Sequence, residues 1–152
     1  PLFRRDQPWS RWSMFVLHPA FPPSSHAVGD LGLCHVRLQA DRRWPWLVLI
    51  PRRDSAREIE DLPPAERGRL MEESILAGQA VRAVGEAVGF PVSKLNLGAL
   101  GNITPQLHVH VVGRREGDPA WPGPVWGVGA ASDYELRDLD RALSAARAAL
   151  GL

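Results

Sequence analysis

The stretch of this sequence best suited to chemistry is residues 106–112, Gln-Leu-His-Val-His-Val-Val. Polar and apolar residues alternate along it with a period of two, which is typical of a strand with one buried face. The apolar residues are then expected to face a core, whereas Gln106, His108 and His110 share the opposite face. Residues two positions apart on a strand are separated by roughly 6.5–7 Å. The pattern therefore predicts a surface that presents two imidazoles and one carboxamide.

Two neighbouring imidazoles on one strand face make a plausible reaction surface. A neutral imidazole can attack phosphorus and form a covalent intermediate, provided that its other ring nitrogen is oriented by an acceptor. A second group must then donate to the leaving atom or hold the phosphate oxygens. His108 and His110 are spaced to place both groups beside one phosphate. Glycines at 98, 101 and 113 would let a ligand approach the backbone closely.

The patterns of apolar and polar residues in other segments predict the strands that position this surface. Residues 28–40 contain an alternating run, and residues 41–43 are a predicted turn. Residues 44–50 form a nearly continuous apolar run, which is typical of a central strand buried on both faces. Residues 94–100 predict a further strand, and a short loop at 101–105 leads into the motif. Together these segments predict an antiparallel sheet.

Two helices are predicted around the sheet. Asp61 is a candidate N-cap before two prolines, and apolar residues then recur at spacings of three and four up to Val88. Gly89 and Pro91 would end this helix after about six turns. Residues 132–135 resemble a capping box, and a second helical pattern follows it. The overall prediction is an α+β fold, an antiparallel sheet with a long packed helix and a C-terminal helix.

The length and composition are those of an ordinary globular domain. The chain has 152 residues, of which 45% are hydrophobic and 23% charged. We expect one domain over residues 1–152, with an irregular N-terminal arm at 1–27, a core at 28–126 and a C-terminal helix at 130–152. The arm contains His18 and His26, which we interpret as surface or packing residues.

Several classes of partner are disfavoured by charge and hydropathy. The formal net charge is +1, so little affinity for nucleic acid is expected. No apolar run approaches the roughly 20 residues needed to span a bilayer, and no secretory leader pattern is visible. A single cysteine, Cys34, rules out an intrachain disulfide. We therefore expect a cytoplasmic protein.

The motif and its neighbours resemble the histidine triad (HIT) family of nucleotide hydrolases and transferases. The family motif is His-φ-His-φ-His-φ-φ, with φ apolar, and Gln106 occupies the first histidine position here. The strand end at 47–53, the strand containing Asn96 and the Trp121-Pro122-Gly123 element occur in the family's order. The resemblance covers roughly residues 30–126 and implies a HIT-like fold that commonly forms a homodimer.

The resemblance also implies roles for individual residues. His108 matches the nucleophile, and His110 matches the histidine that contacts the phosphate or the bridging atom. Gln106 can hydrogen-bond but cannot shuttle a proton. Asn96 matches an asparagine near the phosphate and sugar, whereas Asn102 lies near a position that is polar in relatives.

Two departures from the family pattern concern substrate contacts. Ile103 occupies the place of the family serine that contacts the leaving group, and Thr104 is adjacent to it. Leu38 or Gln39 occupies the place of an acidic residue that contacts ribose. We therefore expect Asn96, Asn102 and Thr104 to bind substrate, and we expect nucleoside recognition to differ most from the family.

Three functional hypotheses follow. The first is a hydrolase or transferase that acts on a dinucleoside polyphosphate, a nucleoside phosphoramidate or a related nucleotide through a nucleotidylated His108, without a cofactor or metal. The second is a catalytically weak or inactive nucleotide-binding or interaction protein on the same fold, which the Gln106 substitution motivates. The third is a metal site on His108 and His110 with His35 as a third ligand, but no cysteine cluster or acidic partner in the motif completes a familiar ligand set.

Overall fold

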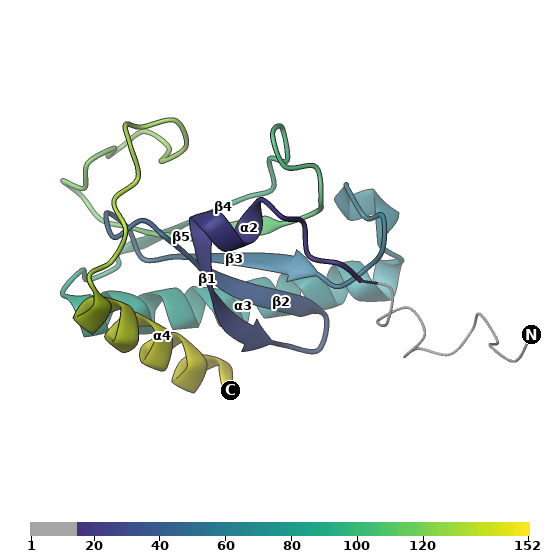
Figure 1. Ribbon diagram of the computed structural model, residues 1–152, viewed down its shortest axis with the longest axis horizontal. Helices are drawn as coiled ribbons and strands as arrows, with labels where there is room; N and C mark the ends of the chain where they lie inside the picture. The colour runs from purple at the N-terminus through teal and green to yellow at the C-terminus, as the bar shows by residue number, and fades with distance from the viewer. Residues whose placement is uncertain (1–14) are drawn as a thin grey trace, which may run out of the picture.

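The computed structural model describes residues 15–152, which fold around one five-stranded antiparallel sheet (Figure 1). The strands follow the order β1-β2-β3-β5-β4 across the sheet. Their bounds are β1 Ser25–Asp30, β2 Cys34–Gln39, β3 Trp46–Pro51, β4 Lys94–Gly98 and β5 Val109–Arg114. The helices are α2 Phe21–Ser24, the short 3₁₀ helix η1 Ile59–Asp61, α3 Pro64–Val88 and α4 Leu136–Leu150. This arrangement confirms the predicted α+β fold.

The hairpin of β2 and β3 forms as the sequence predicts. All six residues of β3 are buried, and this strand lies at the centre of the sheet between β2 and β5. Strand β1 instead begins at Ser25, inside the range expected to be irregular. Its pattern is weak because Gly29 lies at a register shift in the pairing with β2. Strand β1 therefore forms because its backbone hydrogen-bonds to β2, and not because its own residues favour a strand.

The motif strand starts later than predicted. Strand β5 begins at Val109, so Gln106 and His108 precede its regular hydrogen-bond ladder. The backbone N–H of Leu107 donates instead to the carbonyl of Ala56 at 2.9 Å. Leu107, Val109 and Val111 are nevertheless buried in the core on the helix side. The side chains of residues 107–111 thus alternate between the two faces as predicted, although Leu107 hydrogen-bonds to Ala56 and not to a strand of the sheet.

Both helices form where the sequence predicts them, and Gly89 ends α3 as expected, but neither predicted N-cap is observed. Helix α3 ends at Gly89, which adopts a left-handed conformation with φ of 78°. Its N-cap is Pro63, because Asp61 instead accepts hydrogen bonds from the backbone N–H groups of Arg57 and Glu58 at the 3₁₀ helix. Helix α4 likewise has Glu135 as its N-cap without a side-chain cap, so the predicted capping box at 132–135 is wrong.

The two faces of the sheet carry different apolar layers. Helix α3 packs on one face, with α4 beside it and against β1 (Figure 1). The opposite face carries an aromatic layer, which also includes partly buried side chains from the segment before α2 and from the loop at 115–130. Its buried members are Phe21, Trp44, Trp46, Val48, Ile50, Phe90, Val112 and Val125. This aromatic layer surrounds the motif histidines.

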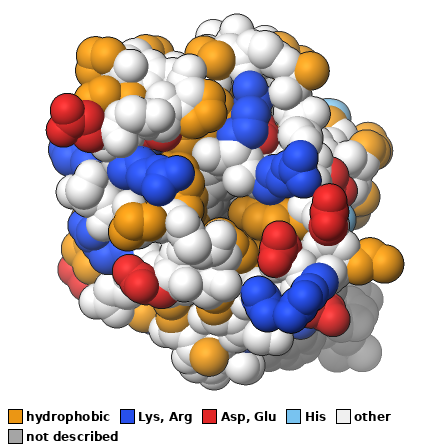
Figure 2. Space-filling model, turned by 90° about the vertical axis from the view of Figure 1, so that its left-hand side faces the viewer, with side chains coloured by type: hydrophobic (Ala, Val, Ile, Leu, Met, Phe, Trp, Pro, Cys, Tyr) orange, Lys and Arg blue, Asp and Glu red, His pale blue; other side chains and the backbone are white. Residues whose placement is uncertain are grey.

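Charged side chains of both signs are intermingled on the end of the molecule that Figure 2 shows. Within the described residues, no helix is long and apolar enough to cross a membrane.

Candidate functional site

The two motif histidines lie side by side on the sheet face opposite α3. Their ring centroids are 4.8 Å apart and the rings are inclined by 76°. His108 is 7% exposed, immediately before β5, and His110 is half-buried within β5. The structure thus brings together the two imidazoles that the alternating pattern places on one face.

The hydrogen bond of His108 determines which of its nitrogens is free. Nδ1 lies 2.7 Å from the backbone carbonyl oxygen of Gln106, and a carbonyl oxygen can only accept. The proton of the neutral ring is therefore on Nδ1, and Nε2 carries a lone pair. The edge-to-face contact with Phe21, at 5.1 Å between centroids, helps to fix the ring plane. In the neutral ring, Nε2 is therefore the nitrogen available to a ligand.

His110 has the opposite arrangement. The indole Nε1–H of Trp46 donates to Nδ1 of His110 at 3.0 Å, and an indole N–H can only donate. Nδ1 therefore accepts, and the proton of the neutral ring is on Nε2. Burial, and then the nearby His108, lower the pKa of His110 to about 3. At neutral pH His110 is an uncharged hydrogen-bond donor.

Two tryptophans enclose His110. The ring centroids of Trp46 and Trp126 lie 5.5 and 5.6 Å from that of His110. Gly98 is the residue directly opposite His110 on strand β4. A Cβ at Gly98 would lie 2.9 Å from the Trp126 ring, so the absence of a side chain there lets the indole pack over the strand.

The side chain of Gln106 turns toward the N-terminal segment rather than toward the imidazoles. Its Oε1 accepts a hydrogen bond from the backbone N–H of His18 at 2.9 Å, and its Nε2 donates to the carbonyl of Val16 at 2.9 Å. The backbone carbonyl of the same residue holds His108. Gln106 thus joins the first described residues of the chain to the histidine pair.

Asn96 lies on the same sheet face, two residues from Gly98, and is held by a buried ion pair. Its Oδ1 accepts from Nη1 of Arg114 at 2.7 Å, and Arg114 makes two further bonds to Asp118 at 2.8 and 3.0 Å. Burial alone would raise the pKa of Asp118, but hydrogen bonds, first among them those from Arg114, lower it overall. Arg114 is only 1% exposed, so its buried charge requires compensation, which the carboxylate of Asp118 provides.

A pocket of about 260 Å³ opens beside His108. It lies between the 57–60 segment and the loop at 99–101, and its lining residues are Arg57, Glu58, Ile59, Glu60, Ala99, Leu100, Gly101, Leu107 and His108. Asn102 is exposed and Thr104 half-buried in the continuation of that loop, and neither belongs to this lining. The loop at 99–101 thus lies beside His108. Asn102 and Thr104, which the sequence predicts to bind substrate, do not line the pocket.

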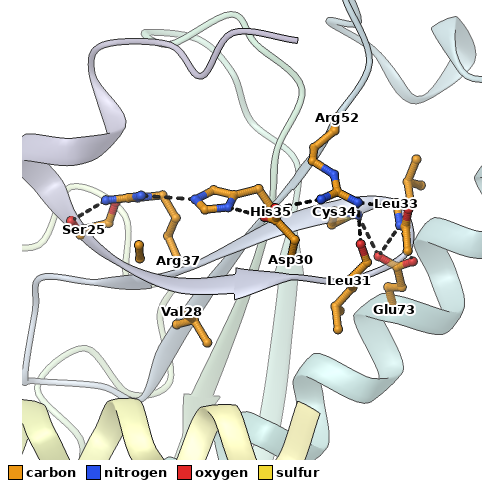
Figure 3. Close-up of polar contacts among 12 residues, drawn as sticks. Ser25, Val28, Asp30, Leu31, Leu33, Cys34, His35, Arg37, Arg52 and Glu73 are labelled. Carbon is orange, nitrogen blue, oxygen red and sulfur yellow. Dashed lines mark hydrogen bonds and ion pairs between the residues drawn. The ribbon is translucent and has the colours of Figure 1, made fainter. Parts of the chain in front are cut away.

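His35 belongs to a separate polar chain, which Figure 3 shows across β1 and β2 as far as Arg52, the residue that directly follows β3. Nδ1 of His35 lies 2.6 Å from Asp30, and Nη1 of Arg37 donates to Nε2 of His35 at 3.2 Å. Both ring nitrogens are therefore engaged. Among residues 15–152, no group of three or more His, Cys, Asp and Glu side chains is placed to hold a metal ion. His35 thus does not act as the third ligand that the metal hypothesis requires.

Comparison with known proteins adds to this geometry. The family model for the HIT domain matches residues 23–117, which is more than half of the chain. This chain belongs to the HIT domain family. The match includes the strands β1–β5, the long helix α3 and both motif histidines.

Solved HIT structures agree closely with this one. A histidine triad (HIT) protein from Sinorhizobium meliloti 1021 is 41% identical, with a TM-score of 0.82 over 90% of this chain and 98% of that chain. A histidine triad protein from Bradyrhizobium japonicum is 38% identical, with a TM-score of 0.83 over 90% and 98%. One from Marinobacter aquaeolei VT8 is also 38% identical, with a TM-score of 0.82 over 91% and 97%. No curated protein matches the chain significantly.

Three residues of this HIT site were not predicted from the sequence. For Trp46 the sequence indicates only a buried strand, for Gly98 only close approach of a ligand to the backbone, and Trp126 has no part in the sequence-based hypotheses. Trp46 shares a face with His110 only once the β3–β5 register is known, because it pairs with Val112. The only indication of this contact in the sequence is that Trp46 lies at the start of an apolar strand. That position does not reveal that its indole N–H bonds to His110.

Proposed function

We propose that this HIT protein is a nucleotide phosphohydrolase or nucleotidyl transferase in which His108 is the nucleophile. The observation that supports this role is the pairing of opposite tautomers. His108 presents an acceptor nitrogen and His110 presents a donor nitrogen, in rings whose centroids are 4.8 Å apart. One phosphoryl group between them would meet both the attacking atom and a stabilising N–H.

In the first step, the lone pair on Nε2 of His108 forms a bond to phosphorus. The bond between phosphorus and the leaving group breaks, and the leaving group takes the electron pair. An amine leaving group also takes up a proton from solvent, so that it departs as the neutral amine. The ring becomes positively charged, and its Nδ1–H remains hydrogen-bonded to the Gln106 carbonyl, which stabilises that charge.

In the second step, water attacks phosphorus, loses a proton to solvent and releases the nucleotide, while the electrons of the N–P bond return to His108. An acceptor other than water would make the same protein a transferase. His110 is neutral, and a neutral imidazole is a very weak acid, so it stabilises phosphate oxygens by hydrogen bonding rather than by giving up its proton.

Gln106 takes the place of the first triad histidine in this proposal. Its carboxamide carries no titratable proton and is bound to Val16 and His18, so it takes no part in proton transfer. It acts instead through its carbonyl on His108 and through its side chain on the N-terminal segment.

The substrate is a dinucleoside polyphosphate, a nucleoside phosphoramidate or a related nucleotide. The pocket beside His108 lies where part of such a molecule would extend from the phosphorus. In this proposal Asn96 donates its amide to the substrate, and the hydrogen bond from Arg114 to its Oδ1 supports that orientation. Asn102 and Thr104 lie in the loop that continues from the pocket lining, and a shift of this loop on binding would bring them to the ligand.

Turnover of a panel of adenosine and guanosine phosphoramidates and dinucleoside polyphosphates tests the proposal. The wild type is expected to form nucleoside monophosphate, and His108→Ala is expected to form none. His26→Ala is the matched control, because His26 lies outside the site and contacts Asp133 at 3.0 Å. Turnover by His108→Ala at the wild-type rate would contradict the role of His108.

The alternative is a nucleotide-binding or interaction protein with weak or no turnover. Gln106 at the first triad position and Ile103 at the place of the family serine favour it. Equilibrium binding of a nucleotide by the wild type, without product from any member of the panel, would support this alternative.

A further inference from the structure

Trp46 reaches His110 across two neighbouring strands. Strand β3 pairs with β5 so that Trp46 is opposite Val112 and Val48 is opposite His110. Trp46 and His110 are therefore diagonal neighbours on one sheet face, a separation that only long or aromatic side chains can bridge. The indole spans it and places Nε1 at 3.0 Å from Nδ1 of His110.

We infer that Trp46 is a positioning residue that holds His110 as the Nε2–H tautomer and so makes it a hydrogen-bond donor beside His108. An indole N–H has no acceptor capacity, so a His110 ring with its proton on Nδ1 would lose the bond and direct two donors at each other. The role in catalysis rests on the proposed function, whereas the tautomer itself can be observed without substrate.

The surroundings of His110 leave Trp46 as its orienting partner. His108 contributes a ring contact, and its own Nδ1 proton is directed at the Gln106 carbonyl. Residue 98 on the adjacent strand β4 is a glycine, which has no side chain to offer. Trp126 contributes a ring face or edge at 5.6 Å, but its Nε1 has no hydrogen-bond partner among the described residues.

The low pKa of His110 agrees with this arrangement. Burial and the neighbouring His108 disfavour the charged ring, so His110 stays neutral over the range in which the site would work. A neutral imidazole has a single N–H, and the hydrogen bond from Trp46 determines which nitrogen carries it. Without this bond, both tautomers would be populated, and part of the molecules would direct a lone pair at the phosphate oxygens.

Trp46→Phe is the informative variant, with Trp126→Phe as its matched control. Both changes keep an aromatic ring near His110 and remove one indole N–H, but only the first removes the bond to Nδ1. The readout is the pair of ¹⁵N chemical shifts of the His110 ring at neutral pH, since a protonated and an unprotonated ring nitrogen differ widely. The amide spectrum of each variant reports whether the fold is intact.

In the wild type and in Trp126→Phe, we expect Nδ1 of His110 to be unprotonated and Nε2 to be protonated. A scalar coupling between Nε1 of Trp46 and Nδ1 of His110 should be visible across the hydrogen bond. In Trp46→Phe, the two ring shifts should move toward each other as the tautomers mix. A wild-type His110 with its proton on Nδ1 would overturn the inference even if the variant failed to fold. Unchanged His110 shifts in a folded Trp46→Phe protein would also overturn it.

With a substrate from the panel, Trp46→Phe should lower kcat on the order of tenfold with little change in KM, because the donor acts on the developing charge. Trp126→Phe should change kcat less. If no member of the panel is turned over by the wild type while the shifts are as expected, the proposed function fails and the tautomer assignment stands. If the wild type is active and Trp46→Phe equals it in kcat, the positioning role is wrong and the proposed function stands.

Discussion

The backbone N–H of His18 donates to the side-chain oxygen of Gln106 at 2.9 Å, although 88 positions separate the two residues. The other end of the same carboxamide donates to the carbonyl of Val16. A single side chain thus attaches the segment before α2 to the residue whose carbonyl orients His108. A glutamine side chain beside the histidine pair thus joins two segments of the chain that are far apart in the sequence.

Gln106→Ala should loosen this segment. It removes two hydrogen bonds that link the motif to residues 16–18, which are worth about 1 kcal/mol each. The amide of His18 should then exchange with solvent at least tenfold faster, and hydrogen exchange by NMR measures this directly. Gln79→Ala, at an exposed position of α3, is the control and should leave that rate unchanged. Equal protection of His18 in both variants would show that the carboxamide does not hold the segment.

The neutral state of His110 predicts a specific acid sensitivity. Its pKa is lowered from 6.5 to about 3 by burial and by His108, so the unfolded chain binds a proton that the folded chain excludes. This residue's contribution to stability is complete above the unfolded pKa and is lost as the pH falls from about 6.5 toward 3.

Between pH 6.5 and 5, the loss should be about 1.5 kcal/mol. Urea unfolding at a series of pH values measures it, with His110→Gln as the comparison. The variant has a different stability overall, but its free energy of unfolding should fall less steeply with acidification. Parallel curves for the two proteins would contradict the neutral assignment of His110.

The ion pair of Arg114 and Asp118 should contribute far more than a surface pair. Both side chains are buried and joined by two hydrogen bonds at 2.8 and 3.0 Å. Asp118→Asn leaves the guanidinium without its counter-charge, so we expect a loss of about 3–5 kcal/mol in the free energy of unfolding.

The control for this change is Asp138→Asn, which removes a half-exposed pair with Arg141 at 3.9 Å. Its cost should be under about 1 kcal/mol. Chemical denaturation compares the two variants, and similar costs would contradict the structural role assigned to Arg114. Asp118→Asn should also lower activity, because Arg114 positions Asn96.

Gly98→Ala tests whether the packing of Trp126 matters for the site. The added methyl group would lie 2.9 Å from the indole of Trp126, so the ring must leave its present position beside His110. We expect kcat to fall severalfold and the tryptophan fluorescence to change. Gly68→Ala is the matched control, because nothing lies within 4 Å of its added Cβ in helix α3. That change should keep the activity and stabilise the protein by up to about 1 kcal/mol. Wild-type kcat in Gly98→Ala would show that Trp126 only covers the strand.

The sequence by itself determined the features that depend on local periodicity. The alternation at 106–112 placed His108 and His110 on one face, and the three-four spacing up to Val88 defined α3 as far as its glycine stop. These patterns are readable because each strand or helix residue exposes its side chain to a side set by its own position in the chain. The N-caps were harder to predict from the sequence, because Asp61 accepts hydrogen bonds within the 3₁₀ helix η1 and does not cap α3.

Only the tertiary structure decided which partners the histidines have. The β3–β5 register brings Trp46 to His110, the loop after β5 brings Trp126, and the segment before α2 meets Gln106. Each contact joins residues that are far apart in the sequence, and no local propensity encodes such pairs. The physical reason is that a ring nitrogen takes its proton according to the donor or acceptor beside it. That neighbour is known only when the chain is folded.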